Sequence, residues 1–110
     1  MDNKDIGFLN TLEDVIRQRL SEQPASSYTA GLAAAGDKRI AQKVGEEALE
    51  LALAAVAGER EEQLNEACDL VYHLLVLLAC KNLTLADVAS QLRQRHQGAV
   101  PDRRLPPGAH

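Results

Sequence analysis

The sequence predicts an all-α protein: an antiparallel bundle of four to five helices that a second copy of the chain completes. Hydrophobic residues make up 45% of the 110 residues, which is enough for one core, while aromatic residues make up only 3%. Alanine and leucine supply most of the apolar side chains, and both favour helices over strands. Apolar residues also recur at steps of three and four, which is the helical period.

The N-terminal part of the chain is expected to form one long helix and one short helix. Apolar side chains recur at helical spacing over about 6–20. Pro24 then breaks the pattern, because proline cannot continue the hydrogen-bond ladder. The polar stretch 26–29 is suited to cap a short helix that ends at Gly36.

The second long helix is expected over about 37–57, with Asp37 as its cap and Gly58 as its terminator. Gly45 lies inside it, where glycine costs about 1 kcal/mol relative to alanine. Gly45 either lets another backbone approach closely or is a tolerated weak position. We expect an apolar face made by Ile40, Val44, Ala48, Leu51 and Ala55, and an opposite polar face made by Arg39, Lys43, Glu46, Glu47 and Glu50.

The third long helix, over about 59–81, is apolar on nearly every side. A helix of this kind must be buried all round, and in so small a protein a partner chain is the simplest cover. We therefore expect a homodimer with this helix near its centre. One apolar face is formed by Leu64, Ala67, Cys68, Val71, Leu74, Leu75 and Leu78, and the other side is apolar at Leu70, Val76 and Leu77.

The last helix is expected to begin at the capping-box pattern Thr84-Leu85-Ala86-Asp87 and to end at Gly98. Residues 1–98 are thus expected to form a single domain. Residues 99–110 contain three prolines and a glycine and are expected to be a mobile C-terminal tail.

Charge and composition also bound the partners. A net charge of −4 and scarce aromatic residues argue against a nucleic-acid partner. No apolar run reaches the ~18 residues that span a bilayer, and the polar N-terminus is unlike a secretory signal, so we expect a cytoplasmic protein with no membrane partner. Cys68 and Cys80 lie on one expected helix, too far apart to bond, and are expected to be reduced core thiols.

Acidic side chains recur at helical spacing on both central helices. Glu46, Glu47 and Glu50 share one face of the first, and Glu66 and Asp69 share one face of the second. A short turn makes these helices antiparallel, so the acids of both can converge. The acids of the first helix, taken alone, are more typical of a solvated face. The second pair lies where its helix turns apolar, which favours a ligand role.

A divalent cation would remove the repulsion between these acids. Oxygen ligands suit a hard cation such as Mg²⁺, which usually arrives with the phosphates of its substrate. We therefore expect metal-assisted phosphate chemistry with Mg²⁺ as the cofactor. Zinc is disfavoured without clustered cysteine and histidine, and the Glu-x-x-His element of di-iron bundles is missing from the sequence.

Basic residues near the acids have two readings. Lys43 precedes Glu47 by one helical turn, which suits either an ordinary ion pair or a phosphate contact beside the metal. Lys38 could join it, and Arg93 and Arg95 could contribute from the last helix. His73, four residues after Asp69, is expected to orient a carboxylate or to bind substrate.

Two segments resemble the phosphoribosyl-ATP pyrophosphohydrolase family, which lies within the MazG-like all-α nucleotide pyrophosphohydrolases. They are Lys43-Val44-Gly45-Glu46-Glu47-Ala48-Leu49-Glu50 and the run from Glu66-Ala67-Cys68-Asp69 through Tyr72-His73 to Leu78. Ser27-Tyr28-Thr29 and Arg95-His96 match flanking parts of the family pattern. The resemblance covers roughly 8–96. One departure is Cys68, where alanine is common in the family.

The resemblance implies a dimeric, Mg²⁺-dependent enzyme of histidine biosynthesis that converts phosphoribosyl-ATP and water to phosphoribosyl-AMP and pyrophosphate. Which acid acts as the base stays open between Glu46 and Glu47. The implied metal ligands are Glu47, Glu50, Glu66 and Asp69, and the implied substrate-binding residues are Lys43, Lys38, Ser27, Tyr28, Thr29, His73 and Arg95.

Two other functions fit the same sequence. A housecleaning pyrophosphohydrolase that acts on noncanonical nucleoside triphosphates would share the acidic pairs. A non-enzymatic helical dimerisation module would use the acids only to stay in solution.

Overall fold

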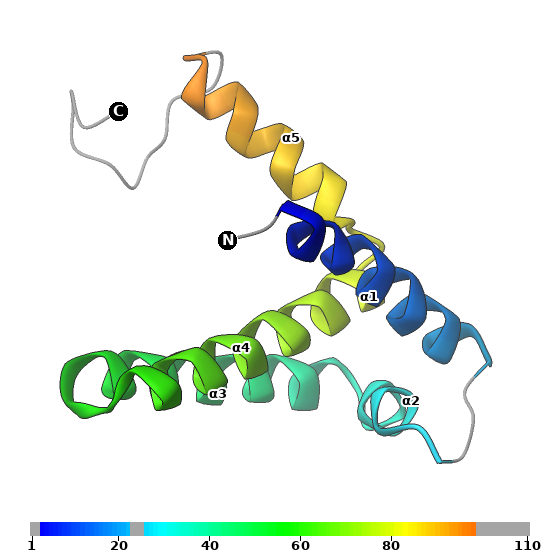
Figure 1. The fold of residues 1–110 in the computed structure, drawn as a ribbon. Helices are drawn as coiled ribbons and strands as arrows, with labels where there is room; N and C mark the ends of the chain where they lie inside the picture. Colours follow the sequence, from blue (N-terminus) through cyan, green and yellow to red (C-terminus); the bar gives the residue numbers. More distant parts are fainter. Residues whose placement is uncertain (1–2, 23–25, 99–110) are drawn as a thin grey trace.

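A computed structural model describes residues 3–22 and 26–98 of the chain. These residues form five α-helices and no strand, which confirms the all-α class (Figure 1). The expected tail at 99–110 lies outside the described residues, so the domain boundary stays a prediction. The helices are α1 (Asn3–Glu22), α2 (Tyr28–Ala34), α3 (Asp37–Ala57), α4 (Arg60–Cys80) and α5 (Leu85–His96).

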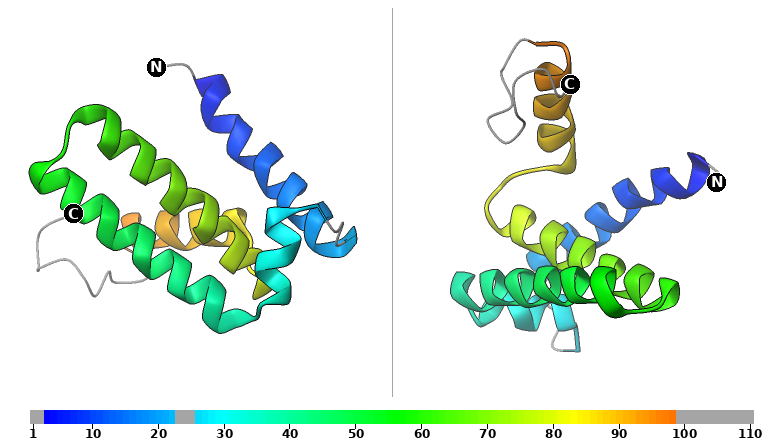
Figure 2. Two further views of the ribbon diagram at one scale, coloured as in Figure 1. Left: turned by 90° about the horizontal axis from the view of Figure 1, so that it is seen from below. Right: turned by 90° about the vertical axis from the view of Figure 1, so that its left-hand side faces the viewer.

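An antiparallel hairpin of α3 and α4 is the centre of the molecule. The two helices lie side by side along most of their lengths (Figure 2). Gly58 and Glu59 join them, and the Gly58 N–H donates to the Ala54 carbonyl at 2.8 Å. A Cβ atom on Gly58 would lie only 2.9 Å from that oxygen, so the tight turn requires glycine.

The core lies at the open end of this hairpin, where α1 and α2 pack against it (Figure 2). Ser27 caps α2, because its side chain accepts a hydrogen bond from the Ala30 N–H at 3.1 Å. Four helices supply the buried cluster, which consists of Ile16, Leu32, Ile40, Leu75 and Val76.

Helix α5 projects away from the hairpin (Figure 1) and has no buried residue. The expected capping box is confirmed: Thr84 and Asp87 exchange side-chain and backbone hydrogen bonds at 2.9 Å. Glu13 of α1 also accepts a hydrogen bond from the Leu85 N–H at 2.6 Å. The start of α5 is thus held from two sides, while the rest extends outward.

Two expectations for α3 are wrong. Gly36, at φ 101°, is the N-cap residue instead of Asp37, whose carboxylate pairs with Lys81 at the end of α4. Glu47 does not lie opposite Ile40: it is 6% exposed and is buried on the same side as Ile40 and Ala54. The spacing of seven residues is two helical turns, which places all three on one face.

Helix α4 exposes apolar side chains that the sequence analysis expects to be buried. Of the expected apolar face, Leu64 is 64% exposed, and Val71 and Leu74 are also exposed. The buried residues are His73, Leu75 and Val76. A single chain therefore covers one side of α4 and leaves the other in contact with solvent.

Within the described ranges, no single helix is long and apolar enough to cross a membrane. The pair α4 and α5 meets length and composition limits only when taken together, across a bend of 101°.

Candidate active site

Three carboxylates meet where α3 and α4 face each other. Glu47 comes from α3, and Glu66 and Asp69 come from the facing turn of α4. One oxygen of each lies within 4.8 Å of the other two. The antiparallel hairpin therefore brings together three of the four residues that the resemblance implied as metal ligands, and their role as ligands stays a prediction.

Glu50, the fourth, lies next to this cluster and is itself exposed. Its pKa is raised above the ordinary value, first by a hydrogen bond with the Glu66 carboxyl and then by the negative charge of Glu47. This is the expected effect of acids forced together, because each disfavours the ionised form of its neighbour. A bound cation would instead lower the pKa of Glu50, because it favours the ionised carboxylate.

Two oxygen atoms of the cluster lack a hydrogen-bond partner within the described ranges. Glu47 Oε2 and Glu66 Oε2 are buried and receive no hydrogen bond from the described part of the chain. Buried carboxylate oxygens are normally hydrogen-bonded or bound to metal, because leaving one without either costs free energy. The donor set is all oxygen and negatively charged, which fits a hard divalent cation such as Mg²⁺.

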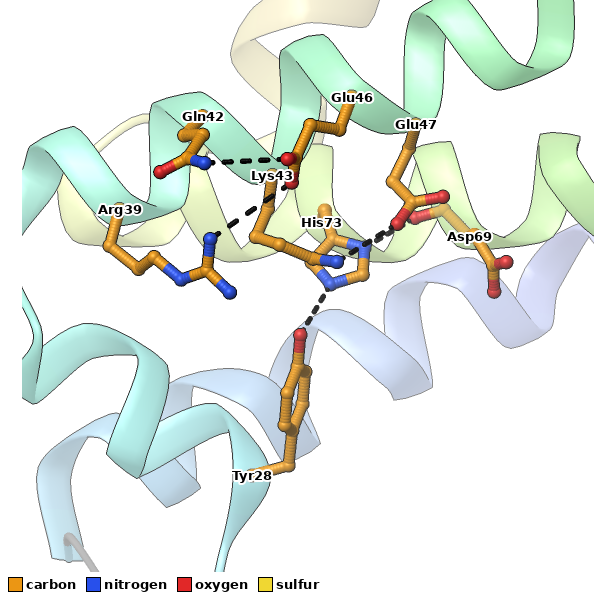
Figure 3. A network of polar contacts seen from close by, with 8 residues as sticks. All are labelled: Tyr28, Arg39, Gln42, Lys43, Glu46, Glu47, Asp69 and His73. Atoms are coloured by element: carbon orange, nitrogen blue, oxygen red, sulfur yellow. Dashed lines mark hydrogen bonds and ion pairs between the residues drawn. The ribbon is translucent and has the colours of Figure 1, made fainter.

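Lys43 borders the cluster on one side. Its Nζ lies 3.2 Å from Glu47 Oε1, and this bond raises the pKa of Lys43 (Figure 3). The ion pair, one of the two readings of the four-residue spacing, is therefore present. The same ammonium group is positioned to meet an anion that approaches the acids.

Glu46 turns away from the cluster, toward the N-terminus of α3. It lies 4.0 Å from Arg39 and accepts a hydrogen bond from Gln42 at 3.3 Å (Figure 3). Lys38 is exposed, about 140° around the helix from Lys43. Neither residue joins the converging acids.

Tyr28, at the start of α2, reaches across to α4. Its hydroxyl lies 2.8 Å from His73 Nε2, and His73 Nδ1 lies 2.7 Å from the carbonyl oxygen of Asp69 (Figure 3). His73 is 7% exposed, whereas Tyr28 is 56% exposed. This chain of hydrogen bonds connects an exposed phenol to the backbone of the acidic cluster.

Ser27 and Thr29 are engaged inside the protein. Both are buried, Ser27 as the cap of α2 and Thr29 through a hydrogen bond with the Tyr72 hydroxyl. These contacts hold Tyr28 between two fixed neighbours. Arg95 lies in α5, which projects away from the acids, so one chain does not bring it to the cluster (Figure 1).

A shallow groove continues from the cluster toward the α3–α4 turn. Its volume is about 290 Å³. Carboxylates and small apolar side chains line it: Glu50, Leu53, Ala54, Ala57, Gly58, Glu62 and Glu66. The site is therefore an open surface between two helices, with acids at its centre.

Two features of the site were missed by sequence reasoning. Arg39 adds a second positive charge on α3, and the four-residue spacing to Lys43 was a signal for it. The burial of Glu47 was signalled by its spacing of seven residues from both Ile40 and Ala54.

Comparison with known proteins agrees with this geometry. The family model described as phosphoribosyl-ATP pyrophosphohydrolase matches residues 9–96. Curated relatives named histidine biosynthesis bifunctional protein HisIE include those of Shewanella oneidensis, 58% identical over 92 residues, Yersinia pestis, 57% over 93, and Salmonella typhi, 58% over 90.

These alignments cover 84%, 84% and 82% of this chain but only 44%, 46% and 44% of the respective relatives. The match thus covers less than half the length of these curated proteins. Because the family model covers most of the chain, including both acidic segments, the chain belongs to the phosphoribosyl-ATP pyrophosphohydrolase family.

Proposed function

We propose that this chain hydrolyses phosphoribosyl-ATP to phosphoribosyl-AMP and pyrophosphate, the second step of histidine biosynthesis, with Mg²⁺ as its cofactor. The observation that carries the proposal is the carboxylate cluster beside Lys43, in which Glu47 is buried and two carboxylate oxygens have no hydrogen-bond partner among the described residues. The family of the chain and the histidine-biosynthesis names of its relatives support phosphoribosyl-ATP as the substrate over other nucleoside triphosphates. Because the substrate is a nucleotide made inside cells, we propose a cytoplasmic location.

Glu47, Glu66 and Asp69 would hold the cation, with Glu50 joining them from the next turn of α3. When bound, Mg²⁺ neutralises the negative charge that develops on the leaving pyrophosphate. Three acids already in place leave little reorganisation for binding, although their mutual repulsion persists until the cation arrives.

The side chains around the cluster would act on the α,β-anhydride. Lys43 Nζ stabilises negative charge on the phosphate oxygens, because it lies at the edge of the acids. A carboxylate orients the attacking water and takes its proton. Glu47 is the better placed of the two candidates, since Glu46 faces Arg39 instead.

We further propose that two copies of the chain associate through α4 and α5. The uncovered side of α4 and the unpacked α5 present apolar side chains that a second copy would bury. Sedimentation should show a dimer, and a charge at Leu64 should dissociate it; a wild-type monomer would contradict this. The exposed apolar residues are Leu64, Val71, Leu74, Val88 and Leu92.

Product identification tests the activity. Purified chain is incubated with phosphoribosyl-ATP and Mg²⁺, and pyrophosphate and phosphoribosyl-AMP are quantified beside parallel reactions with deoxynucleoside triphosphates. Asp69→Asn should lower the rate by roughly 100-fold or more, because a few kcal/mol of charge stabilisation is lost. Glu61→Gln, at an exposed acid in the first turn of α4, is the matched control. Faster hydrolysis of the triphosphates would point to a housecleaning enzyme instead.

A further inference from the structure

The hydrogen bonds of His73 define which partner supplies each proton. His73 Nδ1 is 2.7 Å from the carbonyl oxygen of Asp69, and a carbonyl oxygen only accepts. Nδ1 therefore carries the proton. In a neutral imidazole Nε2 must then accept, so the proton of the 2.8 Å contact comes from the Tyr28 hydroxyl.

Aromatic packing holds this arrangement in place. The rings of Tyr28 and Tyr72 both meet the His73 ring edge to face, at centroid distances of 5.8 and 5.6 Å. Tyr72 is itself tied to Thr29 of α2 through its hydroxyl. Because His73 is buried, its ring has little room to turn and exchange its two nitrogens.

The consequence concerns Tyr28. A phenol has one hydroxyl proton, and Tyr28 donates it to His73 Nε2 inside the protein. Its oxygen keeps lone pairs, and more than half of the side chain is exposed beside Lys43 (Figure 3). A phosphate oxygen has no proton to give, so Tyr28 is unsuited to bind the phosphate chain. A ligand at this position must bring a donor.

We infer that Tyr28 Oη accepts a hydrogen bond from a ribose hydroxyl of the nucleotide substrate, and that His73 is the positioning residue that makes Tyr28 an acceptor. The inference rests on the proposed function. Lys43 is the cation that meets phosphate, and the ribose hydroxyls are the donors nearest to the phosphate chain of a nucleotide. Substrate recognition is thus divided between a cation for phosphate and an acceptor for the sugar.

The tautomer is testable without substrate. Nitrogen-15 NMR of the histidine rings at about pH 8, above the ordinary titration range of histidine, distinguishes a protonated Nδ1 from a protonated Nε2. The His73 signals are assigned by comparison with His73→Gln. We expect Nδ1–H; a protonated Nε2 would overturn the inference.

Affinity measurements test whether Tyr28 binds a ribose hydroxyl of the substrate. Affinity is measured calorimetrically with Ca²⁺ replacing Mg²⁺ to slow turnover, for phosphoribosyl-ATP and for analogues made from 2′-deoxy-ATP and 3′-deoxy-ATP. Wild type should lose about 3- to 10-fold in affinity for one analogue, the worth of one hydrogen bond. Tyr28→Phe should bind the full substrate that much more weakly and no longer distinguish the analogue.

Two further variants separate positioning from simple damage. Tyr72→Phe removes a neighbouring phenol whose hydroxyl bonds to Thr29. This variant should still prefer the substrate over the analogue that lacks the ribose hydroxyl. His73→Phe frees the Tyr28 proton and should abolish the preference. If Tyr28→Phe still discriminated as wild type does, or if wild type bound all three ligands equally, Tyr28 would not read the sugar.

The two proposals fail in different ways. A hydroxyl preference that depends on Tyr28, without any release of pyrophosphate, would reject the proposed activity and keep this inference. Pyrophosphate release without a preference for the ribose hydroxyl would keep the proposed activity and reject this inference.

Discussion

Lys43 Nζ lies 3.2 Å from one oxygen of Glu47, while the other oxygen of the same carboxylate is buried and unpartnered among the residues that the structure describes. One side chain therefore faces a cation of the protein on one side and the acidic cluster on the other. We therefore expect the site to be sensitive to loss of the Glu47 charge.

Glu47→Gln keeps the shape of the side chain and removes its charge. We expect pyrophosphate release to fall by roughly 100-fold or more, and the rise in melting temperature on adding Mg²⁺ to shrink, because ligand binding stabilises only the folded state that binds it. Steady-state assays and thermal melts with Mg²⁺ and with EDTA measure both effects. An unchanged Mg²⁺ response would remove Glu47 from the cation site.

Glu50→Gln should separate the stability of the fold from its response to Mg²⁺. Glu66 and Glu47 raise the pKa of Glu50. Such a carboxyl stabilises the fold below its unfolded pKa, and this contribution is lost as the pH rises through the folded value. In EDTA at neutral pH the variant should therefore melt at or above the wild-type temperature, yet respond less to Mg²⁺. A lower melting temperature in EDTA would contradict the repulsion.

Gly45→Ala and Gly58→Ala should change stability in opposite directions. A Cβ on Gly45 meets no described atom within 4 Å, so alanine should add about 0.5–1 kcal/mol through helix propensity. A Cβ on Gly58 would lie 2.9 Å from the Ala54 oxygen, so alanine should cost about 1–3 kcal/mol. Urea denaturation measures both. Equal signs for the pair would refute this account, and a destabilising Gly45→Ala would revive the close approach of another backbone.

Glu13→Ala should loosen the start of α5. The Glu13 carboxylate accepts the Leu85 N–H at 2.6 Å, one of the first-turn amides that have no partner within the helix. Its loss should cost about 1–3 kcal/mol locally and speed hydrogen exchange at that amide. Amides in the middle of α4 should be unaffected. Asp14→Asn, at the exposed neighbouring residue of α1, is the control and should leave Leu85 protected.

Cys80 should react slowly with alkylating reagents. Burial, and then the negative charge of Asp37, raise the pKa of its thiol above the ordinary value of 9.0. Less thiolate is present at any given pH, so the midpoint of iodoacetamide labelling should lie higher in the folded protein than in urea. Cys68 is exposed, so the expectation of a core thiol is wrong for it, and Cys68→Ala leaves a single thiol for this measurement. A lower midpoint in the folded chain would show that burial does not control this group.

Local sequence signals predicted the helices well. Gly36 and Gly58 lie at breaks between helices, and the Thr84–Asp87 capping box begins the last helix within one residue of its observed start. These features depend on neighbours within a turn or two, so they are readable from the chain alone. The prediction that Glu47 lies on the polar face is wrong, and Ile40 seven residues earlier indicates its burial.

The sequence by itself determined the all-α class, the hairpin of two acidic helices and the family, because periodicity, breaks and motifs are local properties. Only the tertiary structure decided which acids converge, that Glu46 turns to Arg39, and that Tyr28 reaches His73 across 45 residues. Which side chains of neighbouring helices meet follows from packing between segments distant in the chain, and spacing along one helix does not specify those contacts.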